Sequence, residues 1–213
     1  MTDLLDLFLH LDRHLAEVVA WAGPWAVLAL AAVVFCETGL VAMPFLPGDS
    51  LLFAAGALAA SGAFDVWGLS GAFLAAAVLG DAVNYAVGHR LGRRAAARLV
   101  RPERLAQAEA FFARYGGRAV VVARFVPVVR TVVPFVAGMG AMSYGRFARY
   151  NLLGAVLWVG PLVAAGYAFG SVPVVRDHFG VLVLGVVAVS LVPLVVEVVR
   201  QRLAAAPARL GAP

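Results

Sequence analysis

The chain has 213 residues, of which 63% are hydrophobic, and its 17 basic and 12 acidic residues give a formal net charge of +5. A soluble domain contains about 45–50% apolar residues, so this composition predicts an integral membrane protein and leaves no room for a separate soluble domain. Cys36 is the single cysteine, which excludes an internal disulfide and a thiolate metal cluster. The sequence shows no signal peptide, and we expect the chain to be inserted whole.

The first half of the chain is predicted to contain a surface helix, a broken apolar segment and one span. Apolar side chains recur at steps of three and four within residues 1–20, which indicates an amphipathic helix on the membrane surface. Residues 24–64 are apolar but interrupted, and we expect a first broken hairpin region there because proline breaks a helix. The charged residues and prolines in this region are Glu37, Pro44, Pro47 and Asp49. Residues 66–88 follow as a transmembrane helix, long enough for a hydrocarbon core of about 30 Å.

The second half repeats this order after a strongly basic connection. Residues 90–118 hold eight of the arginines and include an amphipathic helix at 102–115. Residues 119–143 form the second broken segment, two transmembrane helices lie within 147–199, and 200–213 form a tail with further arginines. The charged residues and prolines of the second broken segment are Arg124, Pro127, Arg130 and Pro134. By the positive-inside rule, both basic regions are expected to be cytoplasmic.

The repeated order predicts an all-α integral membrane fold with inverted repeats, as a single multi-pass domain over 1–213. Because both basic regions are expected in the cytoplasm and 147–199 crosses twice, residues 119–143 must return to the side from which they enter. The first broken region is then expected to enter from the other side, as a second re-entrant hairpin. Oppositely oriented broken segments that meet near the midplane are typical of transporters with a central site. The side on which the N-terminus lies stays open.

Four charged residues inside the broken segments are the main candidates for a functional site. Glu37 and Asp49 lie in the first segment, and Arg124 and Arg130 lie in the second. An unpaired charge at a helix centre costs about 2.5–3.5 kcal/mol on insertion scales, so we expect these acids and arginines to meet. Arginine presents a planar fork that suits phosphate. The pattern predicts a phosphate-headgroup site with titratable carboxylates beside it, and a bracing ion-pair cluster without a ligand is the structural alternative.

Several further residues are candidates for supporting this site. They are Pro47, Pro127 and Pro134 in the broken segments, and Asp81, Asn84, Tyr85 and Asn151 in the spans. The prolines open the backbone and can re-aim the charged side chains. Contacts between helices through small and polar residues explain the polar set equally well.

Several motifs carry a resemblance to a known family. The second half contains "FFARYGGRAVVVARFVPVVRTVVPFVAG" followed by "FARYNLLGAVLW". The first half contains Glu37, the stretch "PFLPGD" that ends at Asp49, and "GDAVNYAVG" from Gly80 to Gly88. Over roughly residues 24–170, the sequence resembles the DedA family, also known as the VTT or SNARE-associated domain family.

The resemblance implies a lipid transporter of the bacterial cytoplasmic (inner) membrane. Members of the family are implicated in the proton-coupled return of undecaprenyl phosphate across the bilayer, and eukaryotic relatives are phospholipid scramblases. Carried over by resemblance, Arg124 and Arg130 would bind the phosphate, and Glu37 and Asp49 would couple protons. The implied partners are an anionic lipid, either a polyprenyl phosphate or a phospholipid, and protons.

Other functions stay open on the residues alone. A phospholipid scramblase or a proton or ion antiporter would share the fold and the carboxylates. A lipid-phosphate enzyme is disfavoured because the apolar body shows no convincing nucleophile or metal cluster, so we expect no enzymatic activity, cofactor or metal. The arginine clusters lack interleaved aromatic residues, so we expect contact with lipid headgroups and not with nucleic acid. The sequence does not predict the oligomeric state.

Overall fold

The computed structural model describes residues 23–40, 48–99 and 102–172. The elements in chain order are α3 (Pro24–Gly39), α4 (Gly48–Ala60), α5 (Val66–Leu99), α6 (Pro102–Tyr115), η1 (Gly116–Arg118), α7 (Ala119–Ala123), α8 (Pro127–Arg130), α9 (Val133–Val136), the π-helical turn η2 (Ala137–Ala141) and α10 (Tyr144–Gly170). The predicted all-α class is confirmed, since these residues contain no β-strand. The predicted surface helix at 1–20, the prolines at 44 and 47, the second span of 147–199 and the tail lie outside the described residues.

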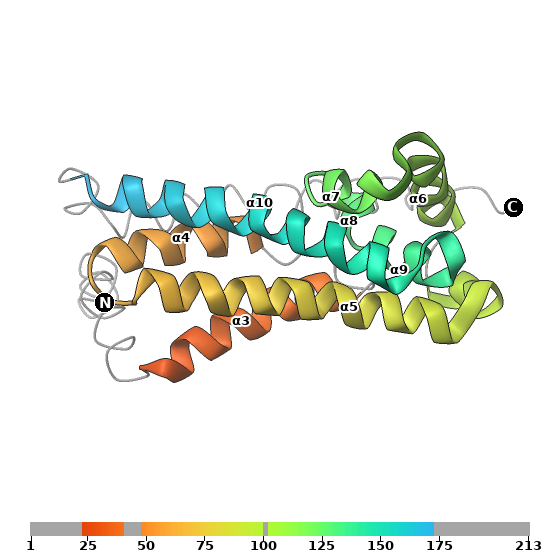
Figure 1. Cartoon of the computed structure of the whole chain (residues 1–213). Helices are drawn as coiled ribbons and strands as arrows, with labels where there is room; N and C mark the ends of the chain where they lie inside the picture. The colour runs from red at the N-terminus through yellow and green to blue at the C-terminus, as the bar shows by residue number, and fades with distance from the viewer. Residues whose placement is uncertain (1–22, 41–47, 100–101, 173–213) are drawn as a thin grey trace, which may run out of the picture.

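Two long antiparallel helices, α5 and α10, run along most of the described structure (Figure 1). The stretches Val66–Leu91 and Tyr144–Gly170 are long and apolar enough to cross a membrane. Helix α5 continues to Leu99, beyond the predicted end of the span and into the basic connection. This extension has a local cause, because residues 93–98 are all alanine or arginine, which are strong helix formers.

The first broken segment consists of α3 and α4, which lie at one end of the structure (Figure 1). The end of α3 and the start of α4 point toward the middle, and α4 leads back to the end where α5 begins. Helix α3 contacts α5, and α4 contacts α10. At Gly56 the α4 and α10 backbones touch, since a Cβ there would lie 3.1 Å from the carbonyl carbon of Val163. This close contact places Asp49, in the first turn of α4, beside α10.

The second broken segment, residues 119–141, is a series of short helices that approaches the middle from the opposite end (Figure 1). Val126 is extended, with φ −117° and ψ 104°, and Pro127 begins α8. A residue before proline avoids the α-helical region, and proline is accepted in the first turn of a helix. The break therefore separates Arg124, which follows α7, from Arg130, which ends α8.

Two apolar clusters fill the two ends of the structure, with a polar layer between them. Along α5, the first cluster extends to Ala77 and the second begins at Tyr85. Along α10, Phe147 belongs to the second cluster and Ala155 to the first. Buried polar and charged side chains are Glu37, Thr38, Asp81, Asn84, Arg124, Thr131 and Asn151. The polar layer therefore crosses the helical body where the two broken segments meet.

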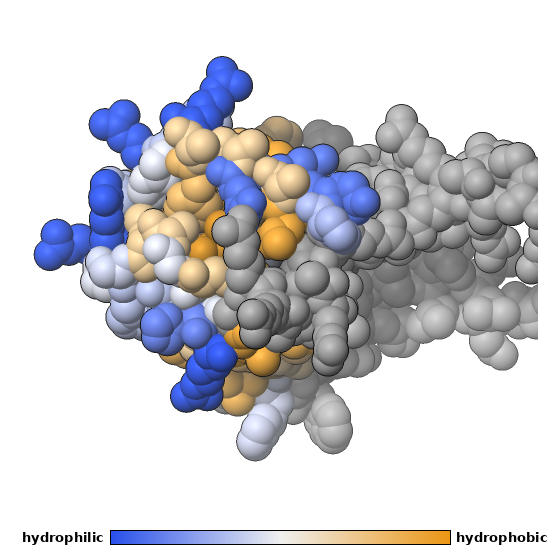
Figure 2. Space-filling model, turned by 90° about the vertical axis from the view of Figure 1, so that its right-hand side faces the viewer, coloured by the Kyte–Doolittle hydropathy of each residue, from blue (hydrophilic) through white to orange (hydrophobic). Residues whose placement is uncertain are grey.

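The end of the structure at which α5 finishes and α10 begins carries exposed arginines (Figure 2). They include Arg90, Arg114, Arg118, Arg146 and Arg149. Hydrophilic side chains surround apolar ones on this face. The arrangement gathers the basic connection into one surface, whose cytoplasmic placement stays a prediction.

Candidate functional site

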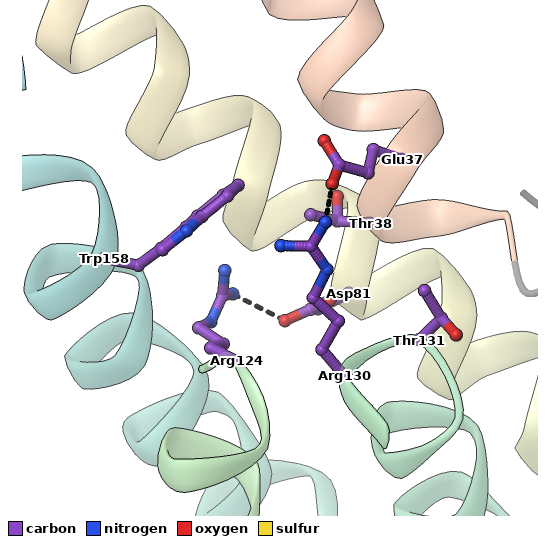
Figure 3. Close-up of a pocket in the computed structure, with 7 residues that line it drawn as sticks. All are labelled: Glu37, Thr38, Asp81, Arg124, Arg130, Thr131 and Trp158. Atoms are coloured by element: carbon purple, nitrogen blue, oxygen red, sulfur yellow. Dashed lines mark hydrogen bonds and ion pairs between the residues drawn. The ribbon is translucent and has the colours of Figure 1, made fainter. Parts of the chain in front are cut away.

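The charged residues of the two broken segments meet in the polar layer (Figure 3). Arg130 forms an ion pair with Glu37 from the end of α3, and its Nη1 lies 3.3 Å from Asp49 Oδ1 in α4. The Glu37 side chain is 1% exposed, whereas that of Asp49 is 57% exposed. Arg130 therefore joins both helices of the first broken segment to the second, and the protein encloses Glu37 far more than it encloses Asp49.

Arg124 has a different partner from the one expected. Its Nη2 lies 2.5 Å from Asp81 Oδ2 in α5 and 2.6 Å from Asn151 Oδ1 in α10. Both charged side chains are 5% exposed. The expectation that the acids of the first broken segment would neutralise both arginines is therefore wrong for Arg124. The signal for Asp81 was in the sequence, since an acid in the middle of a predicted span also needs a partner.

Trp158 of α10 lies beside both arginines, although it was not among the predicted site residues. Its ring centroid is 5.7 Å from Cζ of Arg124 and 5.8 Å from Cζ of Arg130. Its indole Nε1 donates a hydrogen bond of 2.7 Å to Asp49 Oδ1. Trp158 follows Asn151 by seven residues and so shares its helical face, which is the pattern that could have identified it.

Asn84 and Tyr85 are neighbours in α5 with different surroundings. The Asn84 amide Nδ2 donates to the backbone oxygens of Thr38 at 3.3 Å and of Thr131 at 2.7 Å. Asn84 therefore ties both broken segments to α5. The Tyr85 hydroxyl donates to the backbone oxygen of Met142 at 2.9 Å, and Tyr85 lines a separate cavity at the arginine-rich end. The geometry thus brings Asn84, but not Tyr85, to the charged cluster.

The described prolines shape the backbone of the second broken segment. Pro127 begins α8, the helix that ends at Arg130, and Pro134 lies in the first turn of α9, where it is buried. Both stand where a helix accepts proline without losing a hydrogen bond. Pro47, the third proline predicted to support the site, lies outside the described residues.

A small cavity lies at the centre of the cluster (Figure 3). Its lining residues are Glu37, Thr38, Asp81, Arg124, Arg130, Thr131 and Trp158. The space open to water is about 10 Å³, the size that holds a single water molecule. Buried Nε atoms of Arg124 and Arg130 and Oγ1 of Thr131 have no hydrogen-bond partner among the described residues. Buried polar atoms are normally satisfied, so these residues, which line the cavity, keep unused hydrogen-bonding capacity.

One family match covers most residues of the charged cluster. A sequence model of the VTT domain matches residues 46–168. The chain belongs to the VTT-domain, or DedA, family. The matched region extends from before Asp49 to beyond Trp158, and Glu37 precedes it.

Relatives of this VTT-domain protein include two that are named as membrane proteins. The chain is 47% identical over 211 residues to Protein DedA of Escherichia coli (strain K12), which covers 96% of each chain. It is 36% identical over 171 residues to Inner membrane protein YghB of the same strain, covering 78% of this chain and 75% of that one. It is 38% identical over 183 residues to an uncharacterized membrane protein of Mycobacterium leprae, covering 81% and 82%. No solved structure matches the chain.

The site of this VTT-domain protein has more carboxylates than guanidinium groups. Glu37, Asp49 and Asp81 face Arg124 and Arg130. Only Asp49 among the three carboxylates is largely exposed. Among the described residues, no group of three His, Cys, Asp or Glu side chains is placed to hold a metal ion. In this arrangement, another anion can replace one of the carboxylates as the partner of an arginine.

Proposed function

We propose that the protein moves a lipid with a phosphate headgroup across the bacterial inner membrane, in exchange with or together with protons. Undecaprenyl phosphate or a related anionic lipid is the expected substrate. The observation that carries the proposal is Arg130, a guanidinium group in the polar layer that is shared between Glu37 and Asp49 of the opposite broken segment. Charges inside a membrane are costly, and this supports a functional site at the buried cluster.

The guanidinium group of Arg130 is better suited to binding phosphate than a lysine or an amide side chain would be. A guanidinium group binds phosphate through two parallel N–H donors. In the structure, one Arg130 donor nitrogen faces Glu37 and the other faces Asp49. The two donors are therefore already directed at separate oxygens, and an arriving phosphate competes with the carboxylates for them.

Proton coupling follows from the burial of Glu37. Its side chain is almost fully enclosed, with 1% of it exposed. When a phosphate engages Arg130, Glu37 loses its counterion in an apolar setting, and a buried carboxylate without a counterion favours the protonated form. Binding of the lipid and uptake of a proton are thereby linked.

The arrangement of the broken segments supports alternating access around this site. They approach the polar layer from opposite ends (Figure 1), and we propose that they are re-entrant hairpins of two inverted repeats, as in transporters whose site lies at the repeat junction. The arginine-rich end of Figure 2 then faces the cytoplasm, since positive charge is retained on that side.

The experiment is translocation of undecaprenyl phosphate in proteoliposomes, with and without an imposed pH gradient. We expect gradient-dependent movement by the intact protein, loss in Arg130→Gln, and retention in Arg146→Gln, which removes an exposed arginine outside the site. Equal movement by Arg130→Gln would refute the proposed site. Lipid movement that does not depend on the pH gradient would instead indicate a passive scramblase. Proton flux without lipid movement would indicate an antiporter.

A further inference from the structure

Trp158 and Arg130 donate to the same oxygen atom. Trp158 Nε1 lies 2.7 Å from Asp49 Oδ1, and Arg130 Nη1 lies 3.3 Å from it. The two donors come from different parts of the fold, α10 and α8, and the acceptor comes from α4. An oxygen that accepts from an indole N–H and a guanidinium N–H at once has the surroundings of an oxygen of a bound anion.

Asp49 is the member of the cluster that can leave. More than half of its side chain is exposed, whereas Glu37 and Asp81 are buried. The protein does not enclose the Asp49 carboxylate, so it can move away from Trp158 and Arg130, whereas the Glu37 carboxylate is enclosed by packed side chains. Departure of Asp49 leaves the Trp158 indole N–H and one Arg130 donor directed at one empty position.

The cavity beside Arg130 and Trp158, which Asp49 does not line, is too small to receive a headgroup as it stands. The space open to water holds about one water molecule, which is too small for a phosphate group with four oxygens. A headgroup can therefore enter only when a side chain withdraws. Once Asp49 withdraws, the indole N–H of Trp158 loses its acceptor, and a ligand oxygen can take the place of the carboxylate oxygen.

We propose that Trp158 is a headgroup-binding residue, and that Asp49 Oδ1 occupies in this structure the position of one phosphate oxygen. The inference rests on the proposed function and assigns different tasks to the two acids. The Asp49 carboxylate occupies the place of the ligand and leaves when the ligand binds, whereas the enclosed Glu37 stays in place and takes up the proton once phosphate engages Arg130. The indole N–H can only donate, so the position takes an oxygen that accepts, such as an unprotonated phosphate oxygen of a lipid phosphate monoester.

The test is binding of farnesyl phosphate to the full chain in detergent. Loss of one hydrogen bond to a charged group is expected to weaken binding by about ten-fold or more in Trp158→Phe, which keeps an aromatic ring beside the arginines. Trp67→Phe, at a side chain that is 82% exposed on α5, is the matched control and is expected to bind like the intact protein. Asp49→Asn is expected to bind farnesyl phosphate more tightly, because the internal competitor has lost its charge.

A second measurement leaves Trp158 intact. The chain has four tryptophans, and replacing the other three by phenylalanine leaves Trp158 as the single emitter. Its fluorescence is expected to change with farnesyl phosphate and not with farnesol, which lacks the phosphate. Dioleoyl phosphatidic acid presents the same phosphate monoester on a phospholipid, so comparing the two titrations separates a polyprenyl source from a phospholipid source.

The outcomes separate this inference from the proposed function. Binding that is lost in Arg130→Gln but unchanged in Trp158→Phe would overturn the role of Trp158 and leave the proposed function standing. Weaker binding in Asp49→Asn would overturn the stand-in role of Asp49. Equal binding by the intact protein and Arg130→Gln, or no binding of farnesyl phosphate by any version, would overturn both.

Discussion

Neutralising Asp81 is expected to lower the free energy of unfolding by about 3 kcal/mol. Asp81→Asn leaves the buried guanidinium of Arg124 without its counterion, and breaking a buried ion pair costs about 3–5 kcal/mol. The lower end of this range applies because Arg124 keeps Asn151 Oδ1 at 2.6 Å and the backbone oxygen of Ala77 at 3.4 Å. Against a typical total stability of about 5–15 kcal/mol, this loss is large.

The assay is denaturant unfolding of purified protein in detergent for Asp81→Asn, Arg124→Gln and the double variant. Because the two side chains contact each other, the double variant should be less destabilised than the sum of the single variants, by roughly 1–3 kcal/mol. Glu103→Gln, which removes an exposed carboxylate on α6, is the control and should unfold like the intact protein. Strictly additive single effects, or an Asp81→Asn variant as stable as the intact chain, would refute the pairing.

Three further predictions concern the site. Arg130→Lys keeps the charge but cannot reproduce two parallel donors, so lipid movement in proteoliposomes should fall well below that of the intact protein; equal rates would contradict the two-donor argument. Glu37→Gln should fold, as judged by its unfolding midpoint, yet its lipid movement should no longer respond to a pH gradient; an unaltered response would exclude Glu37 as the proton carrier. Asn84→Ala leaves the buried backbone oxygens of Thr38 and Thr131 without their donor. It should lower the free energy of unfolding by about 1–3 kcal/mol in the same assay. An unchanged midpoint would show that these hydrogen bonds do not stabilise the fold.

The cost of charge in a membrane made part of the site predictable. Glu37, Asp49 and Arg130 were expected to meet because none is tolerable alone in an apolar segment, and they do meet. The break at Pro127 was also predictable, since proline constrains its own backbone and that of the residue before it.

The partners of individual side chains were not predictable in the same way. Arg124 could have paired with any acid of the polar layer, and its choice of Asp81 depends on how α5 and α10 are rotated about their axes. The helical period places Trp158 on the face of Asn151, but its hydrogen bond to Asp49 depends on how α4 packs against α10. The sequence predicted a span over residues 66–88 and did not predict that the helix continues beyond it, through alanine and arginine, to Leu99.

The central claim is that a phosphate replaces a carboxylate at Arg130 and that Glu37 takes up the proton. Its most direct test is to add farnesyl phosphate to purified protein in weakly buffered detergent near neutral pH and to follow proton uptake with an indicator dye. We predict uptake of about one proton more per bound ligand by the intact protein than by Glu37→Gln, and no uptake by Arg130→Gln. Farnesyl phosphate that binds with the same proton uptake in the intact protein and in Glu37→Gln would contradict the account.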